Sequence, residues 1–308
     1  MVYLDIKIYE HNITLEIFKN KEYIEKINRS CNNSKQDNDD AYKTATSVIT
    51  ESLQLIEDEE FTIYVNHIYY FALTNKQKEV WMKGLKGSFS DAADVLFDSF
   101  AKTAIYFTNK EYKNRISFVF DKVTTGYIIS GKNNREIFEN GYKIDGSLLS
   151  LSTLGSVIFR FVKDSGNKKI IQEMLKIFYT NDIDEAVAQV YKGDDSGING
   201  LAELSKKNFI KFLSENLQNK EKEDLTNLIK SEVDRFVDIF YQRYSGLLNK
   251  KYNMDIVIVG RVFTNMKRIH KYFKEKINEK FPESDIYFEE LKQAVTFALP
   301  LMIDELKW

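Results

Sequence analysis

The clearest hydrophobic pattern in the chain is a short apolar run near its C-terminal end, Met254 to Asn265 (MDIVIVGRVFTN). Consecutive β-branched residues lead to Gly260, and apolar residues at helical spacing follow from Met266 to Phe273. This pattern is typical of a buried parallel strand that turns at a glycine into a helix. Ligands of open α/β sheets lie at the carboxyl ends of such strands, so this turn is a candidate binding site.

The first part of the chain alternates between strand and helix patterns. Apolar alternation over Val2–Tyr9, Ile13–Phe18 and Tyr23–Ile27 predicts an antiparallel meander. A stripe of apolar residues at 3.6-residue spacing predicts a helix from Ala41 to Ile56. Further elements are expected as strands at Phe61–Val65, Asp94–Phe97 and Ile116–Phe120, and as helices at Lys76–Leu85 and Ser99–Phe107.

From Leu148 onward the pattern is mostly helical, and the longest predicted helix is Asp224–Lys250. The apolar strand described above then leads into a helix that ends near Phe281, a strand at Ile286–Phe288 and a last helix that ends at Trp308. A second meander is expected where Ile116–Phe120 pairs with strand patterns at Thr125–Ser130 and Glu136–Asn140. The chain thus has two halves that each begin with a meander and continue into helices and strands, which indicates a duplicated α/β fold.

Composition narrows the class of protein. The 308 residues are 43% hydrophobic and 29% charged, which is typical of a globular protein with one large domain or two. A net charge of −2 gives no electrostatic reason to bind nucleic acid or an anionic membrane. No apolar run approaches the ~20 residues that cross a bilayer, and charged residues near the start argue against a signal peptide. We therefore expect a cytoplasmic protein.

Residue types that commonly bind metals or act as nucleophiles are scarce. Cys31 is the only cysteine, and His11, His67 and His270 have no metal-ligand spacing. The sequence also lacks a P-loop, a GxGxxG turn, a GxSxG elbow and an HExxH helix. Short motifs alone therefore indicate no enzyme class.

Five segments carry a longer-range resemblance: LDIKIYEHNITLEIF, VLFDSFAKTA, FVFDKVTTGYII, DGSLLSLSTLGS and VIVGRVFTN. Their order resembles that of the actin, sugar kinase and heat-shock chaperone ATPase superfamily, and more closely its N-acetylglucosamine kinase and BadF/BadG ATPase branch. The resemblance implies two ribonuclease H-like (actin-like ATPase) α/β domains with a central interdomain cleft. The implied domains are 1–108, completed by a C-terminal helix at 290–308, and 109–289.

In that superfamily two glycine-rich hairpins hold the phosphates of ATP, because glycine permits positive φ and a close backbone approach. Here Lys7 and Ile8 stand in the first hairpin, and residues 121–123 (Asp-Lys-Val) stand in the second. Lys7 or Lys122 could bind phosphate as a point charge, and Thr124 is a further nucleotide-binding candidate. Alternatively, both lysines are solvated hairpin residues.

The resemblance also assigns roles to two aspartates. Asp5 matches the residue that holds magnesium-bound water, and its alternative interpretation is a strand-end aspartate that bonds the turn. Asp98 matches the general base that accepts the proton of a sugar hydroxyl during phosphoryl transfer. The alternative is that Asp98, expected directly after a strand, caps the next helix.

The remaining candidates lie in the two later motifs. Asp145 and Gly146 stand where a Gly-Asp-Glu-Gly-Ser-Gly turn contacts the sugar, although Asp145 could equally be a loop or cap residue. Gly260 keeps the first glycine of the adenosine turn, and Arg261 replaces the second. Arg261 could bind the base or a phosphate, block the cleft, or lie at the surface.

Loss of glycines at the nucleotide turns, together with loss of two acidic residues, favours a non-catalytic or nucleotide-impaired member of this family. Such a protein would bind or regulate, with a small sugar as ligand and a second copy or an active relative as partner. The alternative is an ATP- and Mg²⁺-dependent amino-sugar kinase built around Asp5, Asp98 and Asp145. An actin-like filament protein is a third class that the fold permits.

Overall fold

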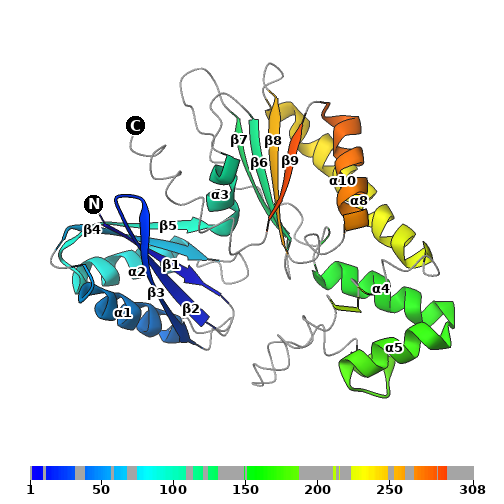
Figure 1. The fold of residues 1–308 in the computed structure, drawn as a ribbon, viewed down its shortest axis with the longest axis horizontal. Helices are drawn as coiled ribbons and strands as arrows, with labels where there is room; N and C mark the ends of the chain where they lie inside the picture. The colour runs from blue at the N-terminus through cyan, green and yellow to red at the C-terminus, as the bar shows by residue number, and fades with distance from the viewer. Residues whose placement is uncertain are drawn as a thin grey trace. The chain divides into compact units, whose positions relative to one another are not determined.

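The computed structural model contains two compact α/β units, one built from the residues up to Tyr106 and one within Phe107–Thr296 (Figure 1). It describes residues 2–9, 12–31, 39–56, 59–67, 75–108, 114–120, 124–130, 149, 151–186, 211–212, 215, 223–248, 253–260, 267–282 and 284–289. The C-terminal helix predicted at 290–308 and the strand pattern at 136–140 lie outside these residues.

The described strands of the first unit form one sheet in the order β3-β2-β1-β4-β5. The three N-terminal strands pair antiparallel, as the predicted meander requires, and β4 and β5 continue the sheet parallel to β1. The strand bounds are β1 Val2–Ile8, β2 Asn12–Lys19, β3 Glu22–Ser30, β4 Phe61–His67 and β5 Ala92–Ser99.

Apolar and polar side chains alternate along the strands with a two-residue period, which gives this sheet one apolar and one polar face. Leu4 and Ile6 of β1 are fully buried on the apolar face, where they join the core formed with helices α1 (Asp39–Leu53) and α2 (Asn75–Ser88). Both helices cover the same face of the sheet (Figure 1). The intervening residues of the strands therefore face the other side.

One boundary differs from the sequence prediction in a way that affects the site. Strand β5 extends to Ser99, so Asp98 lies within the strand, where it pairs with Asn66 of β4. The expectation that Asp98 follows the strand is therefore wrong. The short helix α3 (Phe100–Ala104) and the 3₁₀ turn η2 (Ile105–Thr108) come next, close to the predicted helix.

In the second unit the described strands form a sheet in the order β7-β6-β8-β9, in which β6, β8 and β9 run parallel. The apolar run that opened the sequence analysis is β8, a fully buried parallel strand as predicted. The strand bounds are β6 Asn114–Phe120, β7 Thr124–Ser130, β8 Met254–Val259 and β9 Asp285–Glu289. The helix bounds are α4 Leu151–Ser165, α5 Lys168–Phe178, α8 Glu223–Tyr244, η4 Ser245–Leu247 and α10 Lys267–Lys280.

An aromatic cluster fills the space between this sheet and its helices. Phe236 of α8 packs edge-on against Phe118 and Phe120 of β6, with ring centroids 5.0 and 5.2 Å apart. Phe240 and Phe273 extend the cluster along α8 and onto α10. Such rings bury large apolar areas, so the cluster anchors β6 against α8 and α10. In the described part of the chain, no helix is both long and apolar enough to cross a bilayer.

Candidate functional site

The polar face of the first sheet carries two rows of side chains that run across the strands. The register places Lys7 opposite Thr14 and Asn66, and Asp5 opposite Glu16 and Tyr64. The rows extend to the outer strands through further direct pairs, which are Thr14 with Asn28, Glu16 with Lys26, and Asn66 with Asp98. Residues separated by up to 93 positions thus meet on one surface.

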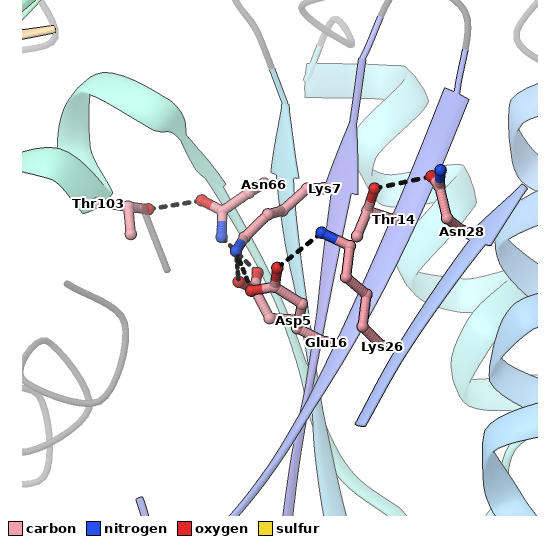
Figure 2. Close-up of polar contacts among 8 residues, drawn as sticks. All are labelled: Asp5, Lys7, Thr14, Glu16, Lys26, Asn28, Asn66 and Thr103. Atoms are coloured by element: carbon pink, nitrogen blue, oxygen red, sulfur yellow. Dashed lines mark hydrogen bonds and ion pairs between the residues drawn. The ribbon is translucent and has the colours of Figure 1, made fainter. Parts of the chain in front are cut away.

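A buried ion cluster occupies the centre of this surface (Figure 2). Lys7 Nζ lies 3.3 Å from Asp5 Oδ2 and donates a hydrogen bond to Glu16 Oε2. Lys26 Nζ contacts the other oxygen, Glu16 Oε1, at 3.3 Å. The Asp5 and Lys7 side chains are fully buried, and that of Glu16 is 3% exposed. Two carboxylates and two ammonium groups therefore neutralise one another, and of the four side chains only that of Lys26, which is 26% exposed, reaches water.

Asn66 connects this cluster to helix α3. Its Nδ2 donates to Asp5 Oδ1 at 2.6 Å, and its Oδ1 accepts a hydrogen bond from Thr103 Oγ1 at 2.5 Å (Figure 2). Burial raises the pKa of Asp5 to about 6, although Lys7 and the Asn66 hydrogen bond act in the opposite direction. Removing the carboxylate from water thus outweighs the stabilisation of its charged form by its partners.

Asp98 has a separate set of donors. Lys102, four residues later in helix α3, places its Nζ 2.8 Å from Asp98 Oδ1. The Tyr64 hydroxyl donates a hydrogen bond to Asp98 Oδ2. Burial and, after it, the negative charge of Asp98 raise the pKa of Tyr64 well above its ordinary value. Tyr64 therefore stays a neutral phenol and remains a hydrogen-bond donor to Asp98.

Two interpretations of β1 from the sequence are wrong. Lys7 is not a solvated hairpin lysine, because it lies within the strand and is fully buried. Asp5 is not a strand-end aspartate that bonds the turn, because it lies at mid-strand and bonds Asn66 of a different strand. The physical reason is the alternation of β1, which directs Ile6 and Ile8 into the apolar core and Asp5 and Lys7 to the polar face.

Gly260 has a role in the packing of its own unit. Its φ of +146° is a conformation that glycine adopts readily, and a Cβ added there would lie 2.3 Å from the carbonyl oxygen of Phe120. The end of β8 thus lies directly against the end of β6, and this close approach requires a glycine. The space that a side chain at residue 260 would need is occupied by backbone.

Other predicted site residues lie outside the described part of the chain. These are Lys122, Asp145, Gly146 and Arg261. Thr124 is the first residue of β7, and only its backbone is described.

Three residues of neighbouring strands were not predicted for this site: Asn66 bonds Asp5, Tyr64 bonds Asp98, and Glu16 shares the Lys7 ammonium group with Asp5. A usable signal was present in the alternation of β2 (Ile-Thr-Leu-Glu-Ile) and β4 (Ile-Tyr-Val-Asn), where polar residues fall on the face opposite the apolar ones. Aligning those polar positions with Asp5 would have brought all three residues to the site.

The environment of Asp5 does not fit the magnesium ion that the resemblance implies. Mg²⁺ takes oxygen ligands and keeps several waters. Asp5 is instead fully buried with an ammonium group on one side and an amide on the other. Among the described residues, no three His, Cys, Asp or Glu side chains come together as a metal-ligand group.

Comparison with known proteins identifies the fold. No known family profile matches the sequence. No curated protein matches it either. Among solved structures, a candidate N-acetylglucosamine kinase from Porphyromonas gingivalis is 13% identical with a TM-score of 0.63, over 97% of this chain and 98% of that chain. The ROK hexokinase of Thermus thermophilus is 10% identical with a TM-score of 0.59, over 100% of both chains.

A third similar structure is a ROK family transcriptional regulator, a homologue of the E. coli MLC protein. It is 11% identical with a TM-score of 0.58, over 100% of this chain and 81% of that chain. At these sequence identities, the structural similarity shows a shared fold and not a shared function. The chain has the α/β fold of sugar kinases, and the predicted α/β fold class with two units is confirmed.

Proposed function

We propose that this chain is a nucleotide-impaired or non-catalytic protein of the sugar-kinase fold, which acts in the cytoplasm as a binding or regulatory protein. Its proposed ligand is a small sugar, and its proposed partner is a second copy or an active relative. The observation that carries the proposal is the engagement of both Asp98 oxygens by Lys102 and Tyr64.

A general base must have an oxygen within hydrogen-bond reach of the hydroxyl that loses its proton. Asp98 Oδ1 is paired with the Lys102 ammonium at 2.8 Å, and Oδ2 accepts the Tyr64 hydroxyl. The Asp98 and Lys102 side chains are only 15% and 10% exposed, so water does little to weaken this pair. A substrate hydroxyl would have to compete with both donors. This arrangement favours a carboxylate that positions neighbouring groups over one that removes a proton.

The fold by itself does not decide between catalysis and regulation. One similar structure is a hexokinase and another is a transcriptional regulator. Function must therefore be argued from the site. The neutralised cluster at Asp5 supports the non-catalytic proposal, because an ammonium group lies beside Asp5 where the kinase hypothesis expects a magnesium ion.

The test measures binding and turnover separately in the purified full chain. Glucose and N-acetylglucosamine are titrated calorimetrically, and ADP formation is followed with millimolar ATP and Mg²⁺. We expect a sugar-binding signal that ATP does not alter, no thermal shift with ATP, and no sugar-dependent ADP formation. Lys102→Met tests the pairing of Asp98 directly, because it removes the ammonium group next to Asp98 Oδ1 while keeping a side chain of similar length.

Asp98→Asn serves as the matched control. It keeps the shape of the side chain but cannot accept a proton. Sugar-dependent ADP formation that disappears in Asp98→Asn would establish the kinase alternative and overturn the proposal. Absence of binding by either sugar would overturn the proposed ligand class.

A further inference from the structure

The sheet leaves Lys7 only one direction in which to extend. Ile6 and Ile8 flank it, and they are 0% and 3% exposed in the apolar core. A one-residue slip of β1 would place Lys7 in that apolar core and both isoleucines on the polar face. Lys7 therefore faces the same side as Asp5, two residues earlier, and its ammonium group reaches back to the row that contains Asp5 and Glu16.

That row places two carboxylates face to face. Asp5 and Glu16 are direct cross-strand partners on β1 and β2, and both are buried. Like charges at such positions destabilise a sheet unless a cation lies between them. Lys7 Nζ is that cation, since it contacts one oxygen of each carboxylate.

The contact between Lys7 and Asp5 is mainly an electrostatic attraction and not a well-formed hydrogen bond. The Asp5 Oδ2 atom is fully buried and makes no geometrically good hydrogen bond to the described residues, although Lys7 Nζ lies 3.3 Å away. Its other oxygen, Oδ1, accepts a hydrogen bond from Asn66. One carboxylate oxygen therefore points toward a positive charge without directional bonding, an arrangement that a bound ion can also satisfy.

We propose that the Lys7 ammonium occupies the place of a divalent cation between Asp5 and Glu16, so that the native chain binds no metal there. With Lys26 on the other oxygen of Glu16, the two carboxylates are already matched by two positive charges. A divalent ion would add uncompensated positive charge to a buried site. Removal of the Lys7 side chain leaves both the volume and the negative charge that a hard cation requires. The inference deepens the proposed function, since it names what replaces the metal of an active kinase.

The experiment uses Mn²⁺ as a stand-in for Mg²⁺ and measures it directly, by the loss of the free-ion EPR signal and by thermal shift. Lys7→Ala is compared with the native chain, with Lys26→Ala and with the double variant Asp5→Asn/Lys7→Ala. We expect Lys7→Ala to bind Mn²⁺ at least about tenfold more tightly than the native chain and to be stabilised by it. Lys26→Ala removes a lysine from the same carboxylate without vacating the site and should behave as the native chain does. The double variant should lose the tighter Mn²⁺ binding that Lys7→Ala gains.

Two results would overturn the proposal. One is native-chain binding of Mn²⁺ that Asp5→Asn abolishes, and the other is a folded Lys7→Ala that binds Mn²⁺ no better than the native chain. If Lys7→Ala does not fold, the side-chain ¹⁵N resonance of Lys7 in the native chain decides, assigned by its loss in Lys7→Arg. A persistent signal that Mn²⁺ does not broaden supports the proposal, and broadening by Mn²⁺ overturns it. These readouts do not involve phosphoryl transfer, so this inference and the proposed function can fail separately.

Discussion

Replacing Asp5 by Asn tests which force dominates at the buried ion cluster. Burial disfavours the charged carboxylate, whereas Lys7 and the Asn66 hydrogen bond favour it, and the net result raises the pKa of Asp5 from 3.8 to about 6. The folded state therefore holds this proton more tightly than the unfolded chain does. Stability from this group is fully present below pH 3.8 and is lost as the pH rises through about 6.

The shift sets the size of the effect. A difference of about two pKa units corresponds to about 3 kcal/mol, since one unit is 1.36 kcal/mol. Asn is neutral at every pH and lacks this dependence. We therefore expect the free energy of unfolding of Asp5→Asn, minus that of the native chain, to increase by about 3 kcal/mol between about pH 4 and pH 8.

Urea unfolding of both proteins at closely spaced pH values measures this difference. Glu51→Gln is the matched control, because it removes a carboxylate from an exposed ion pair with Arg29 and should change stability by less than about 1 kcal/mol. A difference that decreases with rising pH would refute the reasoning, because it would mean that the attraction of Lys7 outweighs burial. A difference that does not change with pH would show that the two forces cancel.

Two further predictions concern the second unit. Gly260→Ala should lower the free energy of unfolding by at least about 2 kcal/mol in urea, because the new Cβ meets the Phe120 carbonyl oxygen at 2.3 Å and φ is +146°. Gly87→Ala, where nothing lies within 4 Å of the added Cβ, should not be destabilising, and an equal loss in both variants would contradict the explanation. Phe236→Ala should cost about 3–5 kcal/mol by the same measurement, since it removes the central ring of the aromatic cluster. Val80→Ala at a 62% exposed position should cost less than about 1 kcal/mol, and similar losses for the two would refute this account of the core.

The elements that local pattern predicts well are those whose burial follows a simple period. Strand β8 is fully buried on both faces, and its unbroken apolar run identified it directly. The helix α8 ends at Tyr244, six residues before its predicted end, and a 3₁₀ turn follows. Helix ends depend on capping and on neighbouring elements more than on periodicity, so their prediction is less precise.

The candidate site shows a different limit. Resemblance led to Asp5 and Asp98, but the sequence alone assigned neither of them a partner on a neighbouring strand. The structure gives both of them partners from other strands, which are Glu16, Tyr64 and Asn66. The roles of these aspartates depend on charge balance as well as on position.

The sequence by itself determined which side of each strand is polar, because a two-residue period is a local property of the chain. That period is sufficient to place Asp5 and Lys7 on one face of β1, although neither residue was interpreted in this way from the sequence. Only the tertiary structure decided that Glu16 lies opposite Asp5, that Lys7 lies between these two carboxylates, and that the end of β8 presses on Phe120. The first two contacts depend on the register of the β1–β2 hairpin, which the turn between the strands sets. The third joins residues 140 positions apart, so it depends on the packing of the whole second unit.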